Sequence, residues 1–188
     1  MKFIKTELDG VFILEPIVYE DNRGFFMESY SKKNFEEQGI SYNFIQDNHS
    51  FTKNKNTLRG LHYQKSPHAQ TTLIKVVSGS ILDVAVDIRK GSPTYGKSIM
   101  ITLSEENHKQ LLLAKGFAHG FYTLSDNVNI IYKMDDIYMS DTDRNIRYDD
   151  KDLAIQWPKG ITPLLSERDD KAPFFENADN NYVYGENC

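Results

Sequence analysis

The sequence has little cysteine, since Cys188 is the only one among 188 residues. A single cysteine excludes an intramolecular disulfide and a zinc cluster built on cysteines, and it makes a catalytic thiol a poor hypothesis. We therefore expect neither thiol-based redox chemistry nor a cysteine nucleophile.

The sequence also lacks an excess of positive charge and any long apolar run. The formal net charge is -5 at pH 7, which argues against non-specific attraction to nucleic acid or anionic lipid. Any anion-binding site must therefore be locally basic. Residues 1–10 alternate charged and apolar side chains, without the apolar stretch of a signal peptide or a membrane span. We expect a cytoplasmic protein with no nucleic-acid or membrane partner.

Apolar side chains are nonetheless abundant, and their spacing is that of β-strands. Hydrophobic residues make up 39% of the chain and aromatic residues 12%, which is enough for the core of one domain. Apolar residues alternate with others over 82–88, 99–103 and 128–134, the period of half-buried strands. The pattern predicts an all-β domain, a β-sandwich or barrel, over residues 1–175, followed by a loosely held polar tail over 176–188.

Turn and cap signals separate the predicted strands. Ser78-Gly79-Ser80 lies between two apolar runs, a spacing that predicts an antiparallel hairpin. A helix is predicted from Ser31 as N-cap to Gly39 as C-cap, and residues 104–110 offer one further turn. The sequence therefore predicts one or two short helices in an otherwise β fold.

Two of the five histidines have neighbours suited to a functional site. His62 follows Arg59 by three residues, so a proton acceptor is close in sequence to a permanently charged, anion-binding group. His119 is bracketed by Gly116 and Gly120, which allow a ligand to approach the backbone. Taken alone, each histidine is more often a hydrogen-bonded residue near a sheet surface.

The histidine spacing does not fit a metal centre. A metal site at the mouth of a β-barrel commonly uses two histidines at alternate positions, a glutamate shortly after and a distant third histidine. Here Gln64 stands two positions after His62, and no acidic residue occurs between Tyr63 and Asp83. We expect no bound metal and no cofactor.

Several segments occur in a recognisable order along the chain. They are DNRGFF (21–26), QDNHS (46–50), LRGLHYQ (58–64), AQ (69–70), SGSILDVAVDIRKGSPTYGK (78–97), LLLAKGFAHGF (111–121), IIYK (130–133) and LSERD (165–169). This series, which covers nearly the whole chain, resembles the dTDP-4-dehydrorhamnose 3,5-epimerase family. The resemblance implies a metal-free, cupin-like jelly roll or β-sandwich, assembled as a homodimer that exchanges strands between subunits.

The resemblance also implies an activity, the inversion of C3, C5 or both in a nucleotide-diphosphate 4-keto-6-deoxy sugar. A proton on a carbon beside a ketone is weakly acidic, so its removal needs a positioned base and stabilisation of the enolate. His62 matches the family's base, Asp169 the carboxylate that orients the base, and Tyr132 the acid on the opposite face.

Further residues match the family's substrate contacts. Tyr138 matches a residue that stacks on the nucleotide base, whereas Phe26 and Glu28 match residues that reach the base of a ligand in the neighbouring subunit. The positions that hold the nucleotide, its diphosphate or the sugar match Arg23, Gln46, Asn48, Arg59, His119 and Arg168.

One position in the site departs from the family's pattern. The family usually has a lysine where this chain has Thr72, and that lysine offsets the negative charge that develops at the ketone. Strand alternation places Lys75 on the opposite face from Thr72, so Lys75 is a doubtful substitute. The donor therefore stays open between a dTDP-hexose and a GDP-heptose, and inversion of C3 alone stays open.

Other function classes share parts of this pattern. A nucleotide-sugar 3,4-ketoisomerase shifts the carbonyl by a related enolisation. A catalytically silent, nucleotide-sugar-binding cupin would keep the anion site without turnover. A metal-dependent cupin oxygenase is the least favoured alternative, because the histidine spacing does not suit it.

Overall fold

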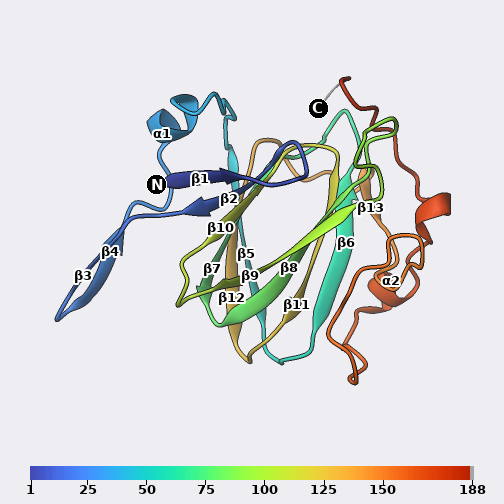
Figure 1. Cartoon of the computed structure of the whole chain (residues 1–188). Helices are drawn as coiled ribbons and strands as arrows, with labels where there is room; N and C mark the ends of the chain where they lie inside the picture. The colour runs from blue at the N-terminus through green and yellow to red at the C-terminus, as the bar shows by residue number, and fades with distance from the viewer. Residues whose placement is uncertain (187–188) are drawn as a thin grey trace.

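In the computed structural model, which describes residues 1–186, two antiparallel β-sheets pack face to face (Figure 1). The six-stranded sheet contains, in spatial order, β1 (Lys2–Lys5), β2 (Val11–Glu15), β10 (Gln110–Leu113), β7 (Thr72–Ser78), β12 (Val128–Met134) and β5 (Gln46–Thr52). The five-stranded sheet contains β13 (Asp143–Asn145), β6 (Leu58–Gln64), β11 (Phe117–Thr123), β8 (Ser80–Asp87) and β9 (Ser98–Ser104). The predicted all-β fold is confirmed.

The remaining elements lie outside these two sheets. A hairpin of β3 (Val18–Asp21) and β4 (Gly24–Met27) projects from the body of the molecule (Figure 1). The helices are α1 (Lys32–Glu36), α2 (Glu167–Asp170) and the 3-10 helix η1 (Phe175–Asn177). Within residues 1–186 no helix is long and apolar enough to cross a membrane.

The predicted helix is present but shorter than its cap signals indicate. The Ser31 side chain accepts a hydrogen bond from the backbone N–H of Asn34, so the predicted N-cap is confirmed. Helix α1 ends at Glu36, and a turn continues to Gly39. The helical turn offered at residues 104–110 is not formed. Ser104 and Asn107 instead cap each other's backbone N–H groups in a turn between β9 and β10.

The hairpin predicted at Ser78-Gly79-Ser80 is wrong. Strand β7 pairs with β10 and β12, whereas β8 pairs with β9 and β11, so the link carries the chain from one sheet to the other. Val76 before the link and Ile81 after it enter the same core between the sheets. Gly79 has a φ of +79°, and a Cβ there would lie 2.7 Å from the Ser125 hydroxyl. The glycine is therefore required by a tight crossover rather than by a hairpin.

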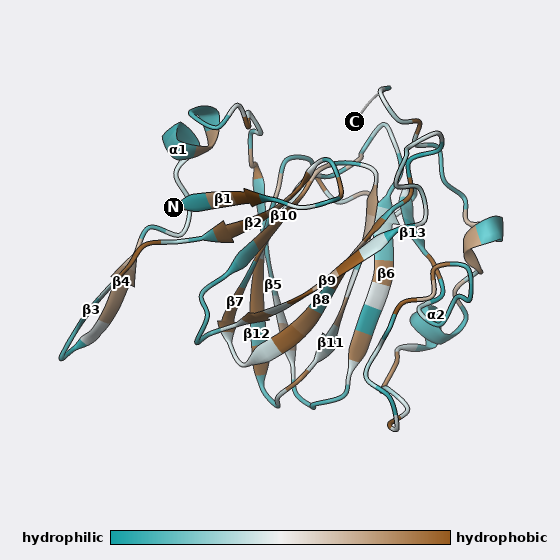
Figure 2. Ribbon diagram, viewed as in Figure 1, coloured by the Kyte–Doolittle hydropathy of each residue, from teal (hydrophilic) through white to brown (hydrophobic). Residues whose placement is uncertain are grey.

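The core has two main layers. One fills the space between the sheets, and the second covers the outer face of the five-stranded sheet with the C-terminal segment. Figure 2 shows hydrophobic residues concentrated in the strands and hydrophilic residues on α1 and α2. Tyr182 is only 2% exposed and packs in the second layer. Tyr182 therefore anchors the tail predicted over 176–188 to the domain, while Cys188 lies outside the described residues.

Candidate active site

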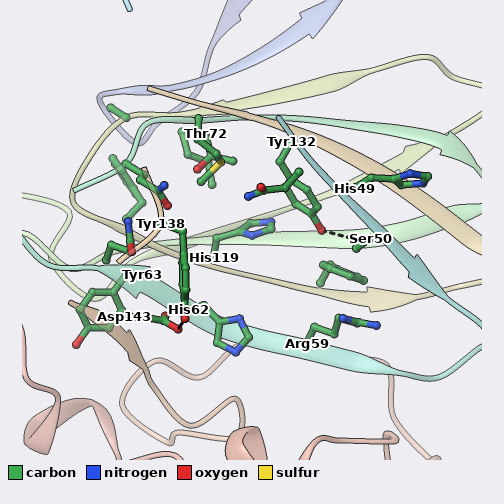
Figure 3. Close-up of a pocket in the computed structure, with 18 of the residues that line it drawn as sticks. His49, Ser50, Arg59, His62, Tyr63, Thr72, His119, Tyr132, Tyr138 and Asp143 are labelled. Carbon is green, nitrogen blue, oxygen red and sulfur yellow. Dashed lines mark hydrogen bonds between the residues drawn. The ribbon is translucent and has the colours of Figure 1, made fainter. Parts of the chain in front are cut away.

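A pocket of about 310 Å³ opens between the two sheets (Figure 3). Its wall combines side chains from β5, β7 and β12 of one sheet with side chains from β6 and β11 of the other. Of the predicted site residues, the pocket is lined by Asn48, Arg59, His62, Thr72, His119, Tyr132 and Tyr138. The structure therefore brings together residues from segments far apart in the sequence.

A β-bulge places Arg59 and His62 on the same face of β6. His62 lies opposite His119 of β11, and Arg59 lies opposite Phe121, so an extra residue of β6 is accommodated between these pairs. Without the bulge, two residues three apart would face opposite sides of the sheet. Gly60, inside the bulge, permits it because a Cβ there would lie 2.5 Å from the Cα of Gly120. The glycines thus allow the close strand approach that aims both functional side chains into the pocket.

His62 is paired with Asp169, which α2 places behind the ring. The His62 Nε2 and Asp169 Oδ1 atoms are 2.6 Å apart, and the side chains are 39% and 3% exposed. Burial raises the pKa of Asp169, but hydrogen bonds from His62, Ser166 and Gly60 outweigh this and hold the pKa below its ordinary value. An ionised Asp169 accepts the proton of Nε2, which leaves Nδ1 of a neutral ring as the proton-accepting nitrogen.

His119 has a carboxylate partner that the sequence did not reveal. Its Nε2 lies 2.9 and 3.0 Å from the two carboxylate oxygens of Asp83, which is fully buried beneath the pocket on β8. Burial raises the pKa of Asp83, and the neighbouring His119 offsets part of that effect. The ring of His119 is also 6.4 Å from the ring of Tyr132, in an edge-on arrangement. His119 is thus held rigidly next to the predicted acid.

Tyr132 points into the pocket from β12. Its hydroxyl is 3.3 Å from the hydroxyl of Ser50, on the neighbouring strand β5. Burial raises the pKa of Tyr132, an effect that the Ser50 hydrogen bond and the Arg59 charge partly offset. The phenol is therefore neutral at pH 7 and is able to donate a proton.

Tyr138 and Arg168 meet at a third carboxylate. The Tyr138 hydroxyl donates to Oδ2 of Asp143 over 3.0 Å, and Nη1 of Arg168 donates to the same oxygen over 2.6 Å. Nearby, Gln46 donates to Oδ1 of Asn48 and accepts from the backbone N–H of Tyr138. Tyr138 and Asp143 line one end of the pocket, where Arg168 is held beside them, and Arg59 lies toward the other end (Figure 3).

Three predicted residues lie away from this pocket. Arg23, Phe26 and Glu28 belong to the β3–β4 hairpin or the segment just after it. The side chain of Arg23 is exposed and pairs with Asp21, and Phe26 is 72% exposed. Arg23, expected among the nucleotide contacts, is therefore not brought to the pocket of its own chain.

Thr72 lines the pocket, and Lys75 does not. Lys75 lies level with Ile131 on β12, whereas Ile74 lies level with Tyr132, so Lys75 and Tyr132 project from opposite faces of the sheet. Burial lowers the pKa of Lys75 on that outer face. The prediction that Lys75 does not replace the usual lysine agrees with this geometry.

Sequence reasoning missed Ser50, Gln64, Asp83 and Asp143 as functional candidates. Asp83 carried a signal, since it is a carboxylate within an apolar, alternating run. Ser50 follows Asn48 by two positions and so shares its face of β5. Asp143 carried no signal, because the segment around it is polar throughout.

Comparison with known proteins agrees with this geometry. The sequence profile of the family described as dTDP-4-dehydrorhamnose 3,5-epimerase matches residues 5–177. A dTDP-4-dehydrorhamnose 3,5-epimerase from Shigella flexneri is 49% identical over 180 residues, which cover 95% of this chain and 98% of the relative.

Two crystal structures are similarly close. The dTDP-4-dehydrorhamnose 3,5-epimerase of Bacillus anthracis, with TDP and PPi bound, is 47% identical with a TM-score of 0.89, over 92% of this chain and 98% of that one. The dTDP-6-deoxy-D-glucose-3,5-epimerase of Legionella pneumophila, in complex with dTDP-4-keto-L-rhamnose, is 46% identical with a TM-score of 0.89, over 94% and 93%. The match extends over nearly the whole chain, which confirms the resemblance and the cupin-like fold. The chain belongs to the dTDP-4-dehydrorhamnose 3,5-epimerase family of carbohydrate isomerases.

Proposed function

We propose that this protein inverts C3 and C5 of a dTDP-linked 4-keto-6-deoxy hexose. The observation that carries the proposal is that the His62–Asp169 pair and the Tyr132 phenol face one pocket from opposite sheets. The choice of a dTDP-hexose over a GDP-heptose is supported by the similar Legionella pneumophila enzyme, which was crystallised with dTDP-4-keto-L-rhamnose.

In this proposal His62 is the base. Nδ1 removes a proton from the carbon beside the ketone, and the ring becomes an imidazolium paired with Asp169. The ionised carboxylate stabilises that positive charge and fixes the tautomer in which Nδ1 is free of its proton. The 2.6 Å contact between the side chains supports this division of roles.

Tyr132 is the acid that completes the inversion. It donates its proton to the enolate carbon from the face opposite His62, so the carbon changes configuration. Removal of one proton and delivery of another leave the sugar with the same composition. The proton on His62 then passes to solvent and the Tyr132 phenolate takes up a proton from solvent, so both groups are restored before the next inversion. The raised pKa of Tyr132 supports the role because it keeps the phenol protonated until the enolate forms.

The enolate oxygen needs stabilisation beyond the single neutral hydroxyl that Thr72 offers at the pocket wall. His119, oriented by the buried Asp83, places its imidazole beside Tyr132 as a further hydrogen-bonding group. We therefore give His119 the role of stabilising the enolate. In this proposal Arg59 and Arg168 bind the diphosphate. The nucleoside is bound by Gln46, Asn48 and Tyr138.

We also propose that the protein is a homodimer, in which the β3–β4 hairpin of one subunit completes the pocket of the other. Within residues 1–186 the hairpin exposes Tyr19, Phe25 and Phe26, which is unfavourable for an isolated chain. Phe51, Val77 and Ile131 are also exposed on the outer face of the six-stranded sheet. A second copy would cover these apolar groups and would receive Phe26, Glu28 and Arg23 at its own pocket. The proposal extends to a cytoplasmic location, where nucleotide-linked sugars are made.

Product analysis tests the proposed reaction. Purified protein is incubated with dTDP-4-keto-6-deoxyglucose, and the sugar is identified by NMR. The expected product keeps its carbonyl at C4 and has inverted C3 and C5. A product with its carbonyl at C3 would establish a ketoisomerase instead, and binding without any change would establish a silent binding protein. Inversion at C3 alone would limit the assignment to a 3-epimerase.

A further inference from the structure

We infer that Gln64 is a positioning residue that holds Tyr138 over the pocket. The inference rests on the proposed function, because it takes Tyr138 as a contact of the nucleotide. Gln64 is the last residue of β6, two positions after His62, and its side chain reaches the pocket wall. It is 6% exposed, so its amide is almost entirely withdrawn from water.

The Gln64 amide forms hydrogen bonds with backbone groups of the residues on either side of Tyr138. Its Nε2 donates to the backbone carbonyl of Ile137 over 3.1 Å, and its Oε1 accepts from the backbone N–H of Met139 over 2.6 Å. Nε2 also donates to the backbone carbonyl of His68 over 2.8 Å. One side chain thus satisfies backbone groups immediately before and after Tyr138, and anchors them to β6.

The segment around Tyr138 depends on such side-chain bonds. Residues 137–139 have no regular secondary structure, and the backbone N–H groups of Thr142 and Asp143 bond only the Met139 carbonyl, not Ile137 or Tyr138. The backbone N–H of Tyr138 itself donates to Oε1 of Gln46. Buried or half-buried backbone groups without partners are costly, which makes the amide bonds of Gln64 decisive for this conformation.

The hydrogen bonds of Gln64 connect the segment of Tyr138 to β6, the strand that carries His62, the proposed catalytic base. Because β-strand side chains alternate, Gln64 and His62 share one face of β6. Figure 3 shows Tyr138 above His62 on the same side of the pocket. The distance between the nucleotide contact and the base is therefore set through Gln64, and this distance determines where the sugar of a bound nucleotide lies.

A double-mutant cycle with Tyr138 separates positioning from general destabilisation. Gln64→Leu gives a side chain of similar size but removes the hydrogen bonds to the Ile137 and His68 carbonyls and to the Met139 N–H. We expect the Kd of dTDP, measured by calorimetry, to rise about tenfold in Gln64→Leu and in Tyr138→Ala. In the double variant the Gln64 change should add less than about twofold, because its effect passes through Tyr138.

The matched control is Asp150→Ala. Like Gln64, Asp150 makes three hydrogen bonds to backbone groups, but it accepts all three, from the N–H groups of Asp152, Leu153 and Phe175, and it does not line the pocket. The Asp150→Ala substitution should lower the melting temperature and leave the Kd of dTDP unchanged. Gln64→Met is the second variant if Gln64→Leu fails to fold, and it is judged by the same cycle.

Three results would overturn the inference. The first is an unchanged Kd of dTDP in the Gln64 variant. The second is an equal rise of the Kd on Gln64 substitution in wild type and in Tyr138→Ala. The third is a Tyr138→Ala protein that binds dTDP as tightly as wild type does. Amide hydrogen exchange at Met139 gives a ligand-free check, since exchange should quicken in Gln64→Leu. If the effects of the Gln64 and Tyr138 substitutions on the Kd were coupled but the protein did not convert the sugar, only the proposed function would be wrong. If the protein converted the sugar but the two effects were independent, only the role of Gln64 would be wrong.

Discussion

His62 and Tyr132 enter the same pocket from opposite sheets, His62 from β6 and Tyr132 from β12 (Figure 3). An enolate is flat around the carbon that has lost its proton. A base on one side and an acid on the other therefore have access to different faces of that carbon. The sandwich itself supplies this separation, because its two layers form the two walls.

Tyr132→Phe should separate proton removal from inversion. The variant lacks the donor on one face but keeps His62 on the other, so a proton from solvent returns only to the side from which it left. We expect inversion to fall by about 10²-fold or more while His62-dependent deuterium uptake continues. NMR of the sugar in deuterated water reports both events. Inversion at the wild-type rate would show that another group is the acid.

Asp169→Asn should disable the base. An amide opposite Nε2 favours the tautomer that carries its proton on Nδ1, so the ring no longer accepts a proton from the sugar. A loss of about 10³- to 10⁴-fold in kcat is expected, as for other histidines that lose an orienting carboxylate. Asp170→Asn, which changes an exposed neighbour on the same helix, is the matched control and should retain activity.

Asp169 also predicts a pH dependence of stability. Its folded-state pKa lies below the ordinary value of 3.8, so its stabilising contribution is complete above that value. The contribution is lost as the pH falls through the lowered pKa. The difference in unfolding free energy between wild type and Asp169→Asn, measured in urea, should therefore shrink as the pH falls from about 5 to below about 4. A difference that grew over this acidic interval would contradict the ionised Asp169.

His119 and Thr72 should differ in their importance for the enolate. His119→Ala removes the imidazole proposed to stabilise the enolate beside Tyr132 and should lower kcat by about 10²- to 10³-fold. Thr72→Val removes only a neutral hydroxyl and should lower kcat less than about tenfold. Steady-state kinetics of both variants make the comparison. A larger loss for Thr72→Val than for His119→Ala would move the enolate oxygen to the β7 side of the pocket.

Subunit mixing tests whether the β3–β4 hairpin completes the neighbour's pocket. Phe26→Ala and His62→Ala proteins are each expected to be impaired. In a mixed dimer, one pocket would have its own His62 and an intact Phe26 from the other chain. Random exchange of equal amounts should restore about a quarter of the wild-type sites. If the mixture stayed as inactive as its components, the hairpin would not act across subunits.

The alternation of apolar residues predicted β8, β9 and β12 because each packs one apolar face in a core layer. For β9 and β12 this layer lies between the sheets, and for the run 82–88 of β8 it is the second layer. It did not predict the pairing at Gly79. A glycine turn between two apolar runs satisfies a hairpin and a sheet-to-sheet crossover equally well, and the choice depends on which sheet closes the core. The anchoring of the C-terminal segment was not predicted because its apolar contacts, Phe175, Ala178 and Tyr182, stand among polar residues without a regular period.

The candidate site, like the fold, was predicted from the sequence only in part. His62, Asp169 and Tyr132 came from family motifs, and the structure adds their spatial relationship. Asp83 and Gln64 act through other residues, and their partners are 36 residues away in His119 and 73 in Ile137. Local spacing carries no information about such contacts, so they become visible only when the strands are assembled.

Deuterium exchange tests the central claim most directly. The protein is incubated with dTDP-4-keto-6-deoxyglucose in deuterated water, and C3 and C5 of the sugar are followed by NMR. Wild type should incorporate deuterium at both carbons, and His62→Ala should incorporate none above the uncatalysed rate. A wild-type reaction that left both C3 and C5 without deuterium would contradict proton transfer by His62 and with it the proposed epimerase mechanism.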